Sequence, residues 1–306
     1  MSAPRLLVVG GSGFIGQHVV SRAVRDGWHV TSMGVQAHDA AQQVQGAAYV
    51  VADLTQQESL RDLITHPFDY VVNLGGYIDH TLFSQGGRAL IDSHFDGLLN
   101  LLQYLDRKVI KRFVQIGSSD EYGNAPAPQH EGLRESPISP YALAKVAATQ
   151  FLQMLHRTEN FPAVTLRLFL TYGPGQGRRR FLPQIIEGCL SNSSFPVSEG
   201  QQLRDFCYVA DVVDAIFMCF EKSVIDGQVL NIASGTPVQI REVIAETARL
   251  VGAGHPQFGQ VAYRPGENMA LVADIELAKR LLGWSPKISL TEGLRMTMES
   301  MKLHGS

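Results

Sequence analysis

The sequence is poor in cysteine and has no long apolar run. Its three cysteines are an odd number, and Cys189, Cys207 and Cys219 do not have the spacing of a metal site. A disulfide framework and a zinc site are therefore not expected, and the thiols should be reduced. No apolar stretch reaches the ~18 residues that cross a bilayer, and the first residues are too glycine-rich for a signal peptide. We expect a cytoplasmic protein with no membrane partner and no metal.

Neither sign of charge is in excess. The 306 residues include 26 Lys and Arg and 29 Asp and Glu, which gives a formal net charge of −3. This balance provides no overall attraction to nucleic acid or to an anionic membrane. The ten histidines include no HExxH motif, which argues against a zinc hydrolase. Hydrophobic residues make up 45% of the chain, as is typical of globular proteins, and the length suggests about two domains.

Short β-branched runs alternate with helical patterns through the first half of the chain. Uninterrupted apolar runs such as Leu6-Leu7-Val8-Val9 suit strands that are buried on both faces. Strands that alternate with helices predict a parallel sheet with right-handed crossovers, that is, an α/β doubly wound Rossmann fold. The predicted strands are residues 5–9, 29–33, 48–51, 70–74, 113–117 and 163–169. The predicted helices are residues 15–26, 57–64, 87–106 and 141–157.

A glycine-rich loop lies between the first strand and the first helix. Gly10, Gly13 and Gly16 follow the strand directly, with Phe14 and Ile15 opening the helix. The first glycine permits a tight turn, the second allows close approach to a pyrophosphate, and the third allows close packing of helix and strand. The helix N-terminus then offers N–H groups to the phosphates. This position in the chain predicts a dinucleotide site formed by these five residues.

The pattern of elements changes after about Tyr172. Glycine and arginine cluster over residues 173–180, and the later elements are more mixed. We therefore predict a dinucleotide-binding Rossmann domain over residues 1–170, with a return segment at about 205–233. A smaller C-terminal α/β domain over residues 171–306 is expected to bind the substrate.

The end of the second strand bears on the choice of dinucleotide. An acidic residue there would bind the ribose 2′-hydroxyl of NAD, but residues 31–35 contain none, and Gly34 lies where the acid is expected. Without a carboxylate nothing repels a 2′-phosphate, so the sequence leans to NADP over NAD, although no arginine follows directly. Asp53 and Leu54, after the third strand, are placed to contact the adenine, and Asp53 could equally be a turn residue.

A serine, a tyrosine and a lysine follow in the order that suits proton transfer to a sugar oxygen. Tyr141 and Lys145 are four residues apart, on one face of a helix that Ser139 and Pro140 would open. A phenol has a pKa of about 10, and a nearby ammonium with a nicotinamide cation would stabilise the phenolate. Ser118, at the carboxyl end of the preceding strand, could bind the reacting oxygen. We predict these three residues to be catalytic.

Together these motifs resemble the extended short-chain dehydrogenase/reductases, the NAD-dependent epimerase/dehydratase family, whose members mostly act on nucleotide sugars. The resemblance covers nearly the whole chain. The further segments that match the family's patterns are residues 167–174, 202–212, 231–235, 264–267 and 282–286.

The resemblance implies several substrate contacts. Arg204 and Arg264 would hold the substrate diphosphate, which guanidinium groups suit, and Ser119 and Asp120 would contact the sugar. The run 178–180 of three arginines is expected to be a solvated loop. Two residues depart from the family's pattern, since Leu170 and His94 each replace an asparagine. The family usually forms homodimers through the long helix and the Tyr141 helix, which the spacing of leucines over 98–105 fits, although packing on the sheet would explain it equally.

Residues 117–123, G-S-S-D-E-Y-G, point to a branch of the family. Dehydratases that act on dTDP-glucose carry Thr-Asp-Glu where this chain has Ser118-Ser119-Asp120, so their paired acids are not reproduced. The segment looks most like that of the reductases of nucleotide-linked 4-keto-6-deoxysugars. The expected function is therefore reduction of a C4 ketone by NAD(P)H, with Tyr141 as the general acid.

The sequence leaves two alternatives open. A nucleotide-sugar 4-epimerase or 4,6-dehydratase would use the same Ser–Tyr–Lys set with a retained NAD. A non-catalytic dinucleotide-binding sensor is disfavoured, because the set is complete.

Overall fold

A seven-stranded parallel sheet forms the centre of the larger part of the chain. The computed structural model describes residues 3–37, 43–61, 66–263 and 266–303. The sheet has the strand order β10-β6-β5-β4-β1-β2-β3, which is that of a doubly wound α/β fold and confirms the predicted Rossmann class. Its strands are β1 (Arg5–Val9), β2 (His29–Gly34), β3 (Ala47–Val51), β4 (Tyr70–Asn73), β5 (Arg112–Ser118), β6 (Ala163–Leu168) and β10 (Val229–Ile232).

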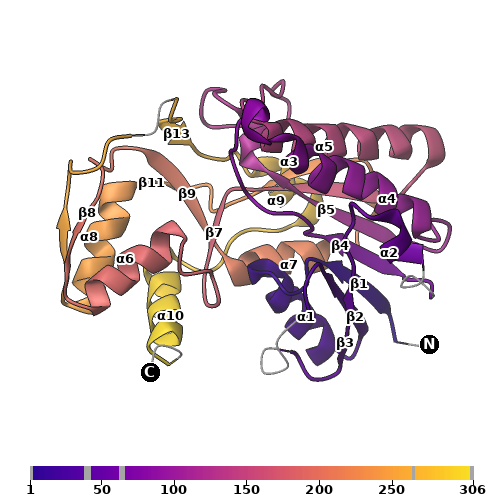
Figure 1. The fold of residues 1–306 in the computed structure, drawn as a ribbon, viewed down its shortest axis with the longest axis horizontal. Coiled ribbons are helices and arrows are strands. Elements are labelled where there is room, and N and C mark those ends of the chain that lie inside the picture. The colour runs from indigo at the N-terminus through magenta and orange to yellow at the C-terminus, as the bar shows by residue number, and fades with distance from the viewer. Residues whose placement is uncertain (1–2, 38–42, 62–65, 264–265, 304–306) are drawn as a thin grey trace.

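Helices cover both faces of this sheet (Figure 1). One face carries α1 (Phe14–Arg25), α7 (Val209–Cys219) and α9 (Glu276–Leu282). The other carries α2 (Gln57–Arg61), α4 (Gly97–Tyr104) and α5 (Pro140–Glu159). The predicted helix over 57–64 thus begins as expected, and its last residues lie outside the described part of the chain.

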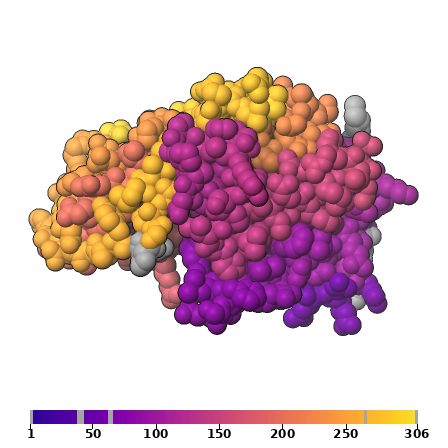
Figure 2. Space-filling view, turned by 90° about the horizontal axis from the view of Figure 1, so that it is seen from above, coloured from indigo at the N-terminus to yellow at the C-terminus, as the bar shows by residue number. Residues whose placement is uncertain are grey.

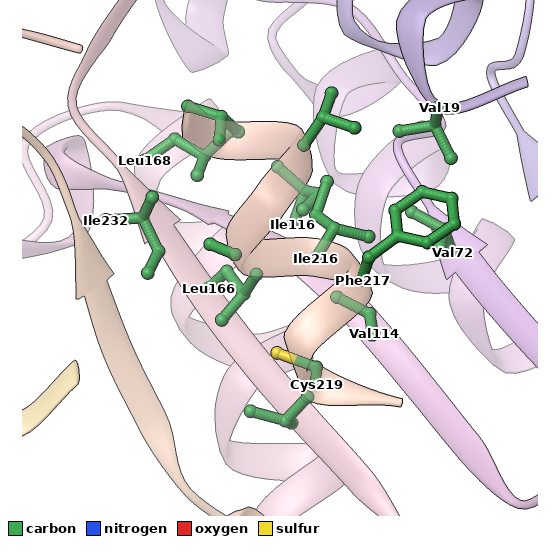
Figure 3. Close-up of a cluster of buried hydrophobic side chains, with 14 of the residues drawn as sticks. Val19, Val72, Val114, Ile116, Leu166, Leu168, Ile216, Phe217, Cys219 and Ile232 are labelled. Atoms are coloured by element: carbon green, nitrogen blue, oxygen red, sulfur yellow. The ribbon is translucent and has the colours of Figure 1, made fainter. Parts of the chain in front are cut away.

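The strands are apolar on both sides because both sides are covered. Successive side chains of a strand point to opposite faces, so Leu6 and Val8 join the core under α1 and α7, whereas Leu7 and Val9 join the core under α4 and α5. Figure 3 shows the first of these cores, where Ile216 of α7 lies against Val114 and Leu166 of the sheet. All three described cysteines are buried and free of disulfides.

A second, smaller lobe is built on short strands. β9 (Leu203–Tyr208) pairs in parallel with β7 (Leu170–Tyr172) and β13 (Ala270–Leu271), and antiparallel with β11 (Pro237–Gln239). A further pair joins β8 (Ser194–Pro196) to β12 (His255–Gln257). The helices α6 (Phe181–Leu190), α8 (Ile240–Val251) and α10 (Leu290–Leu303) pack here around a core of their own. Seen from above, the left end of the molecule is built mainly of these orange and yellow residues (Figure 2).

The chain crosses between the two lobes more than once. After β9 in the small lobe it returns through α7 and the short helix η5 (Ser223–Ile225) to β10, the edge strand of the large sheet. It returns a second time with α9, whose Ala278 and Leu282 join the core beside α7, as does Trp284. The indole N–H of Trp284 donates a hydrogen bond to the carbonyl of Asp211 at 3.0 Å, which ties this return to α7.

The long helix predicted over 87–106 is not one regular helix. A short helix η2 (Phe83–Gln85) precedes α3 (Arg88–Ile91), a π-helical segment follows over Asp92–Asp96, and α4 completes the stretch. Four leucines on this stretch pack on the sheet within the same chain, which accounts for their spacing; they are Leu98, Leu101, Leu102 and Leu105. In the part of the chain that the structure describes, no helix has the length and apolar character to span a membrane.

Candidate active site

One cavity of about 760 Å³ collects most of the residues that the sequence predicts to be functional. It lies where the carboxyl ends of β1, β4, β5 and β6 face the start of α6 and strand β9, the position where open α/β sheets bind their ligands. The predicted residues that line it are Gly10, Gly13, Phe14, Ile15, Gly16, Ser118, Ser119, Asp120, Tyr141 and Lys145.

The glycine loop is shaped by close contacts that leave no room for side chains. Gly10 has a φ of +74°, and a Cβ there would lie 2.9 Å from the carbonyl oxygen of Leu74. A Cβ on Gly16 would lie 2.2 Å from the carbonyl oxygen of Gly10. Gly13 directly precedes α1, whose first N–H groups have no partner within the helix and face the cavity. The closely packed glycine loop and the free N–H groups at the start of α1 together form a cradle that fits a pyrophosphate.

Ser118 is held at the end of β5 by a tight turn. The short helix η4 (Ser119–Tyr122) begins there, with the Ser118 hydroxyl accepting from the N–H of Asp120 at 3.1 Å. The carboxylate of Glu121 accepts from the N–H of Ser118 at 2.9 Å, so backbone and side chain of the serine are both fixed. This turn explains why a serine at the end of a strand can present its hydroxyl to the cavity.

Tyr141 and Lys145 lie in the first turns of α5. Ser139 caps this helix by accepting from the N–H of Ala142, as predicted. The Lys145 ammonium donates to the carbonyl oxygen of Ile116 at 2.9 Å and lies 5.8 Å from the centre of the Tyr141 ring. Burial lowers the pKa of Lys145 to about 8, although the charge of Glu121 opposes this. Lysine and tyrosine are thus neighbours on one helix face at the cavity floor.

Burial dominates the protonation of Tyr141. It raises the pKa of the phenol well above its usual value, while a hydrogen bond with Ser118 lowers it to a smaller extent. The sequence-based expectation was a phenol of lowered pKa. The protein groups alone act in the opposite direction, so a further positive charge at the ring is required for the phenolate to form.

A buried ion cluster supports this floor from below. Arg167 of β6 donates to Glu121 through Nε at 2.9 Å and to Glu135 through Nη2 at 2.6 Å. Thr149 of α5 donates to the same Glu121 carboxylate at 2.9 Å. Glu121 therefore links the Ser118 turn, β6 and the Tyr141 helix at one point. The sequence matched Arg167 to a family pattern but gave no sign of this cluster.

His94 lines the cavity from the π-helical segment. Its ring is 5% exposed and meets the Tyr141 ring edge-on, with 5.0 Å between the ring centres. Its Nε2 lies 2.8 Å from the carbonyl oxygen of Tyr77. Burial, with a smaller contribution from the charge of Lys145, lowers the pKa of His94 to about 3. In the sequence this histidine is only a departure from the family's pattern, and the structure places its ring against that of Tyr141.

A second histidine, which was not predicted, also lies beside Tyr141 in the cavity. His80 follows β4 in a loop that lines the cavity, with 6.0 Å between its ring centre and that of Tyr141. Its Nε2 is 3.7 Å from the Asp120 carboxylate. Burial raises the pKa of Asp120, and the charges of His80 and Arg204 oppose this shift. No motif marks a histidine in a loop, so only the fold brings it to the site.

Other predicted contacts lie away from the cavity lining. The Asp53 carboxylate accepts from the N–H and the hydroxyl of Thr55, at 2.9 and 2.8 Å, as in the alternative turn role. Leu54 is buried. The Arg204 guanidinium pairs with the carboxylate of Glu267. Arg264 lies outside the described residues. The adenine and diphosphate contacts expected of these residues stay predictions.

The arginine run only partly matches the solvated loop that the sequence suggests. Arg178 lies 3.8 Å from Glu187 and is exposed. Arg179 and Arg180 are also exposed, yet both line the cavity near the start of α6. They bring positive charge to the cavity lining. No group of three His, Cys, Asp or Glu side chains that could hold a metal occurs within the described ranges.

Comparison with known proteins shows which family shares this arrangement. The family model described as "NAD dependent epimerase/dehydratase family" matches residues 6–233. This chain belongs to that family. The match spans the glycine loop, Ser118, Tyr141, Lys145 and the strands that carry them.

Relatives in this family match the chain along nearly its whole length. A dTDP-glucose 4,6-dehydratase of Xanthomonas campestris pv. campestris (strain B100) is 26% identical, covering 96% of this chain and 92% of the relative. A UDP-glucuronate 4-epimerase of Thermodesulfobacterium geofontis (strain OPF15) is also 26% identical, covering 97% and 95%. These relatives act on nucleotide sugars, by elimination and by epimerisation respectively, according to their names.

Solved structures resemble the fold equally closely. The crystal structure of UDP-glucose 4-epimerase with UDP-glucose from Thermotoga maritima has a TM-score of 0.88 and 26% identity, covering 99% of this chain and all of that one. MoeE5 in complex with UDP-glucose and NAD has a TM-score of 0.85 and 26% identity, with 99% and 100% covered. Neither the comparisons nor the structure supports the expected lean to NADP, since the dinucleotide named in that complex is NAD.

Proposed function

We propose that this protein is a nucleotide-sugar 4-epimerase that oxidises and re-reduces C4 of its substrate with a retained NAD. The observation that carries the proposal is the meeting of Ser118, Tyr141 and Lys145 with the glycine cradle in one cavity. This replaces the reductase favoured at first by residues 117–123, because the named relatives are epimerases and dehydratases.

The chain's own residues fit a dinucleotide. The cradle of Gly10, Gly13 and Gly16 would hold its pyrophosphate, because each close contact there depends on the absence of a side chain. Lys145 is placed to donate to a ribose hydroxyl from the cavity floor. Bound NAD would supply the hydride acceptor. Its cationic ring would also supply the positive charge that the Tyr141 phenolate needs, because burial raises the pKa of this phenol. We assign this ligand to the lobe of residues 1–170 with its return at 205–233, and the sugar to residues 171–306.

Proton transfer is the task of Tyr141. Its phenolate would take the proton of the C4 hydroxyl as hydride leaves C4, which yields a 4-keto sugar. Ser118 would donate to the same oxygen, and the Lys145 ammonium would stabilise the phenolate. Return of hydride to the other face of C4, with Tyr141 giving the proton back, yields the 4-epimer. Protons and electrons balance without an external reductant.

Elimination of water is disfavoured by the residues beside Ser118. Ser119 is buried and has a hydroxyl where dTDP-glucose dehydratases carry an acid, so Asp120 is the single carboxylate that the turn presents to the cavity. An acid–base pair across C5 and C6 would need a second acid. We therefore place epimerisation before dehydration.

The reductase reading remains as a second candidate because of two features of the sequence. Residues 117–123 resemble reductases of 4-keto-6-deoxysugars, and the end of β2 at Gly34 carries no acid. A reductase would consume NAD(P)H and release it oxidised after each turnover. The two candidates therefore differ in whether the hydride comes from the sugar itself.

A sugar labelled at C4 separates the two. The purified protein is incubated without added NAD(P)H with UDP-, dTDP- and GDP-hexoses that carry deuterium at C4. Epimerisation predicts a 4-epimer that keeps its deuterium, seen by NMR and mass spectrometry. The proposal fails if no hexose is epimerised while NADPH is oxidised by a 4-keto-6-deoxy nucleotide sugar.

We also propose a homodimer, as the family resemblance implies. Its support is the set of apolar side chains on α4 and α5 that the single chain leaves incompletely covered: Tyr104, Phe151 and Met154 are partly buried, and Leu143 is exposed. Sedimentation of the purified protein at micromolar concentration would give the mass of two chains if this is correct.

A further inference from the structure

His94 has a buried nitrogen without a partner. The carbonyl oxygen of Tyr77 can only accept, so the Nε2 atom 2.8 Å away carries the proton and donates. A neutral imidazole has one N–H, which leaves Nδ1 as a bare acceptor. Nδ1 is buried and has no hydrogen-bond partner among the residues that the structure describes. A buried acceptor of this kind costs free energy unless something donates to it.

The surroundings of the ring restrict what that donor can be. The ring fills the space beside Gly76, where a Cβ would lie 2.2 Å from Cε1 and 2.5 Å from Nδ1. The Tyr141 ring covers another side, edge-on at 5.0 Å. The Lys145 ammonium already donates one hydrogen bond to the carbonyl oxygen of Ile116. His94, Gly76, Tyr141 and Lys145 all line the same cavity, so the open direction for a donor is the cavity itself.

A dinucleotide bound in the cavity would pass close to the Nδ1 atom of His94. The glycine cradle follows β1, and Gly10 is packed against Leu74 and Gly75, which follow the neighbouring strand β4. A dinucleotide that starts in the cradle and reaches Tyr141 has to cross the ends of β1 and β4, and so pass Gly76 and His94. The part nearest to Lys145 and Tyr141 is the ribose beside the redox ring, and its hydroxyl groups are hydrogen-bond donors.

We propose that His94 is a cofactor-binding residue, whose bare Nδ1 accepts a hydrogen bond from a hydroxyl of the nicotinamide ribose. Lys145 donates to the ribose from one side and His94 accepts from the other. The Tyr77 carbonyl fixes the tautomer that makes this possible. This inference rests on the proposed function only in its need for a bound dinucleotide, and it assigns a role to a histidine that stands in place of an asparagine.

The test compares the affinities of the wild type and of His94→Phe for NAD and for NAD analogues, as in a double-mutant cycle. Dissociation constants are measured by titration calorimetry for NAD and for analogues that each lack one hydroxyl of the nicotinamide ribose, with protein stripped of nucleotide. The wild type should bind one analogue roughly tenfold more weakly than NAD. His94→Phe keeps a flat ring but has no acceptor, so it should bind NAD roughly tenfold more weakly and treat that analogue and NAD alike. His94→Asn, which keeps an acceptor and a donor, should recover part of the difference.

Each other outcome overturns the inference. A wild type that binds the analogues and NAD equally has no such hydrogen bond, whatever the variants do, so this arm holds even if His94→Phe does not fold. Equal discrimination by the wild type and His94→Phe assigns the hydroxyl to another group. A change confined to the KM of the sugar assigns Nδ1 to the substrate. If the protein binds neither NAD nor NADP, the proposed function fails as well, whereas tight binding without discrimination removes the His94 inference alone.

Discussion

The guanidinium of Arg167 and the carboxylate of Glu121 are both wholly buried and 2.9 Å apart, directly beneath the turn that holds Ser118. Arg167 belongs to β6 and Glu121 to the turn after β5, so the pair joins two neighbouring strands at the end where the cavity lies. The Arg167 guanidinium also lies 4.6 Å from the centre of the Tyr122 ring. The turn that carries Ser118 is thus fixed to the sheet by a charge pair that has no contact with solvent.

Removing one partner of this pair should destabilise the fold strongly. Arg167→Met leaves the Glu121 carboxylate buried without its counter-charge, which typically costs about 3–5 kcal/mol. The double variant Arg167→Met/Glu121→Leu removes both charges and should be more stable than the single one. Urea unfolding followed by circular dichroism measures the three free energies. Equal stability of the wild type and Arg167→Met would show that the pair contributes nothing to the fold.

Loss of the Tyr141 hydroxyl should abolish turnover without loss of structure. Tyr141→Phe removes the proton acceptor, and a positioned acid–base group contributes about 10²–10⁴-fold to the rate. The dinucleotide should still bind, because the glycine cradle is unchanged. Steady-state kinetics on the epimerised sugar give the rate, with Tyr70→Phe as the matched control, because Tyr70 lies at the start of β4 and packs on Trp28 away from the cavity lining. Unchanged kcat in Tyr141→Phe would contradict the assignment.

The rate should fall at alkaline pH because of Lys145. Burial lowers the pKa of this ammonium to about 8, so its charge is present below pH 8 and is lost as the pH rises further. The phenolate of Tyr141 then loses its stabilising charge, and kcat should decline above about pH 8. A profile from pH 6 to 10 measures this limb. In Lys145→Arg, whose guanidinium stays charged, the limb should disappear even if the rate is low; a limb that persists there belongs to another group.

A methyl group in the cradle should block the dinucleotide. The Cβ of Gly16→Ala would lie 2.2 Å from the backbone oxygen of Gly10, which cannot move as a side chain can. We expect loss of bound nucleotide, with destabilisation of α1 packing. Gly177→Ala is the control, because it lines the same cavity and its Cβ meets open space. Nucleotide released per chain after denaturation measures both variants, and equal amounts would remove the glycine loop from the site.

The sequence predicts the large sheet well because strands that are buried on both faces are apolar at every position, and this pattern is visible in the sequence. Leu6-Leu7-Val8-Val9 is apolar without alternation, and both faces of β1 are in fact covered. The helix over 87–106 is predicted less well. The π-helical segment at Asp92–Asp96 has no local sequence signal, and its His94 packs against Gly76 and Tyr141, which are distant in the sequence.

The same distinction holds within the site. Ser118, Tyr141, Lys145 and the glycines were predictable, because each depends on local geometry at the end of a strand or the start of a helix. His80 and the Arg167–Glu121–Glu135 cluster were not, because loops and buried ion pairs are assembled by contacts between residues 30 or more positions apart. The lean to NADP rested on one missing acid at the end of β2, and a missing contact does not identify the ligand that takes its place.

The claim that the hydride cycles within one bound dinucleotide is tested most directly by identifying the nucleotide that the purified protein carries. The protein is freed of small molecules by gel filtration and denatured, and the released nucleotide is identified and counted by mass spectrometry. The proposal predicts NAD at close to one per chain. An empty site, or NADP that is lost on gel filtration, would contradict retention and favour a reductase that exchanges its cofactor in each turnover.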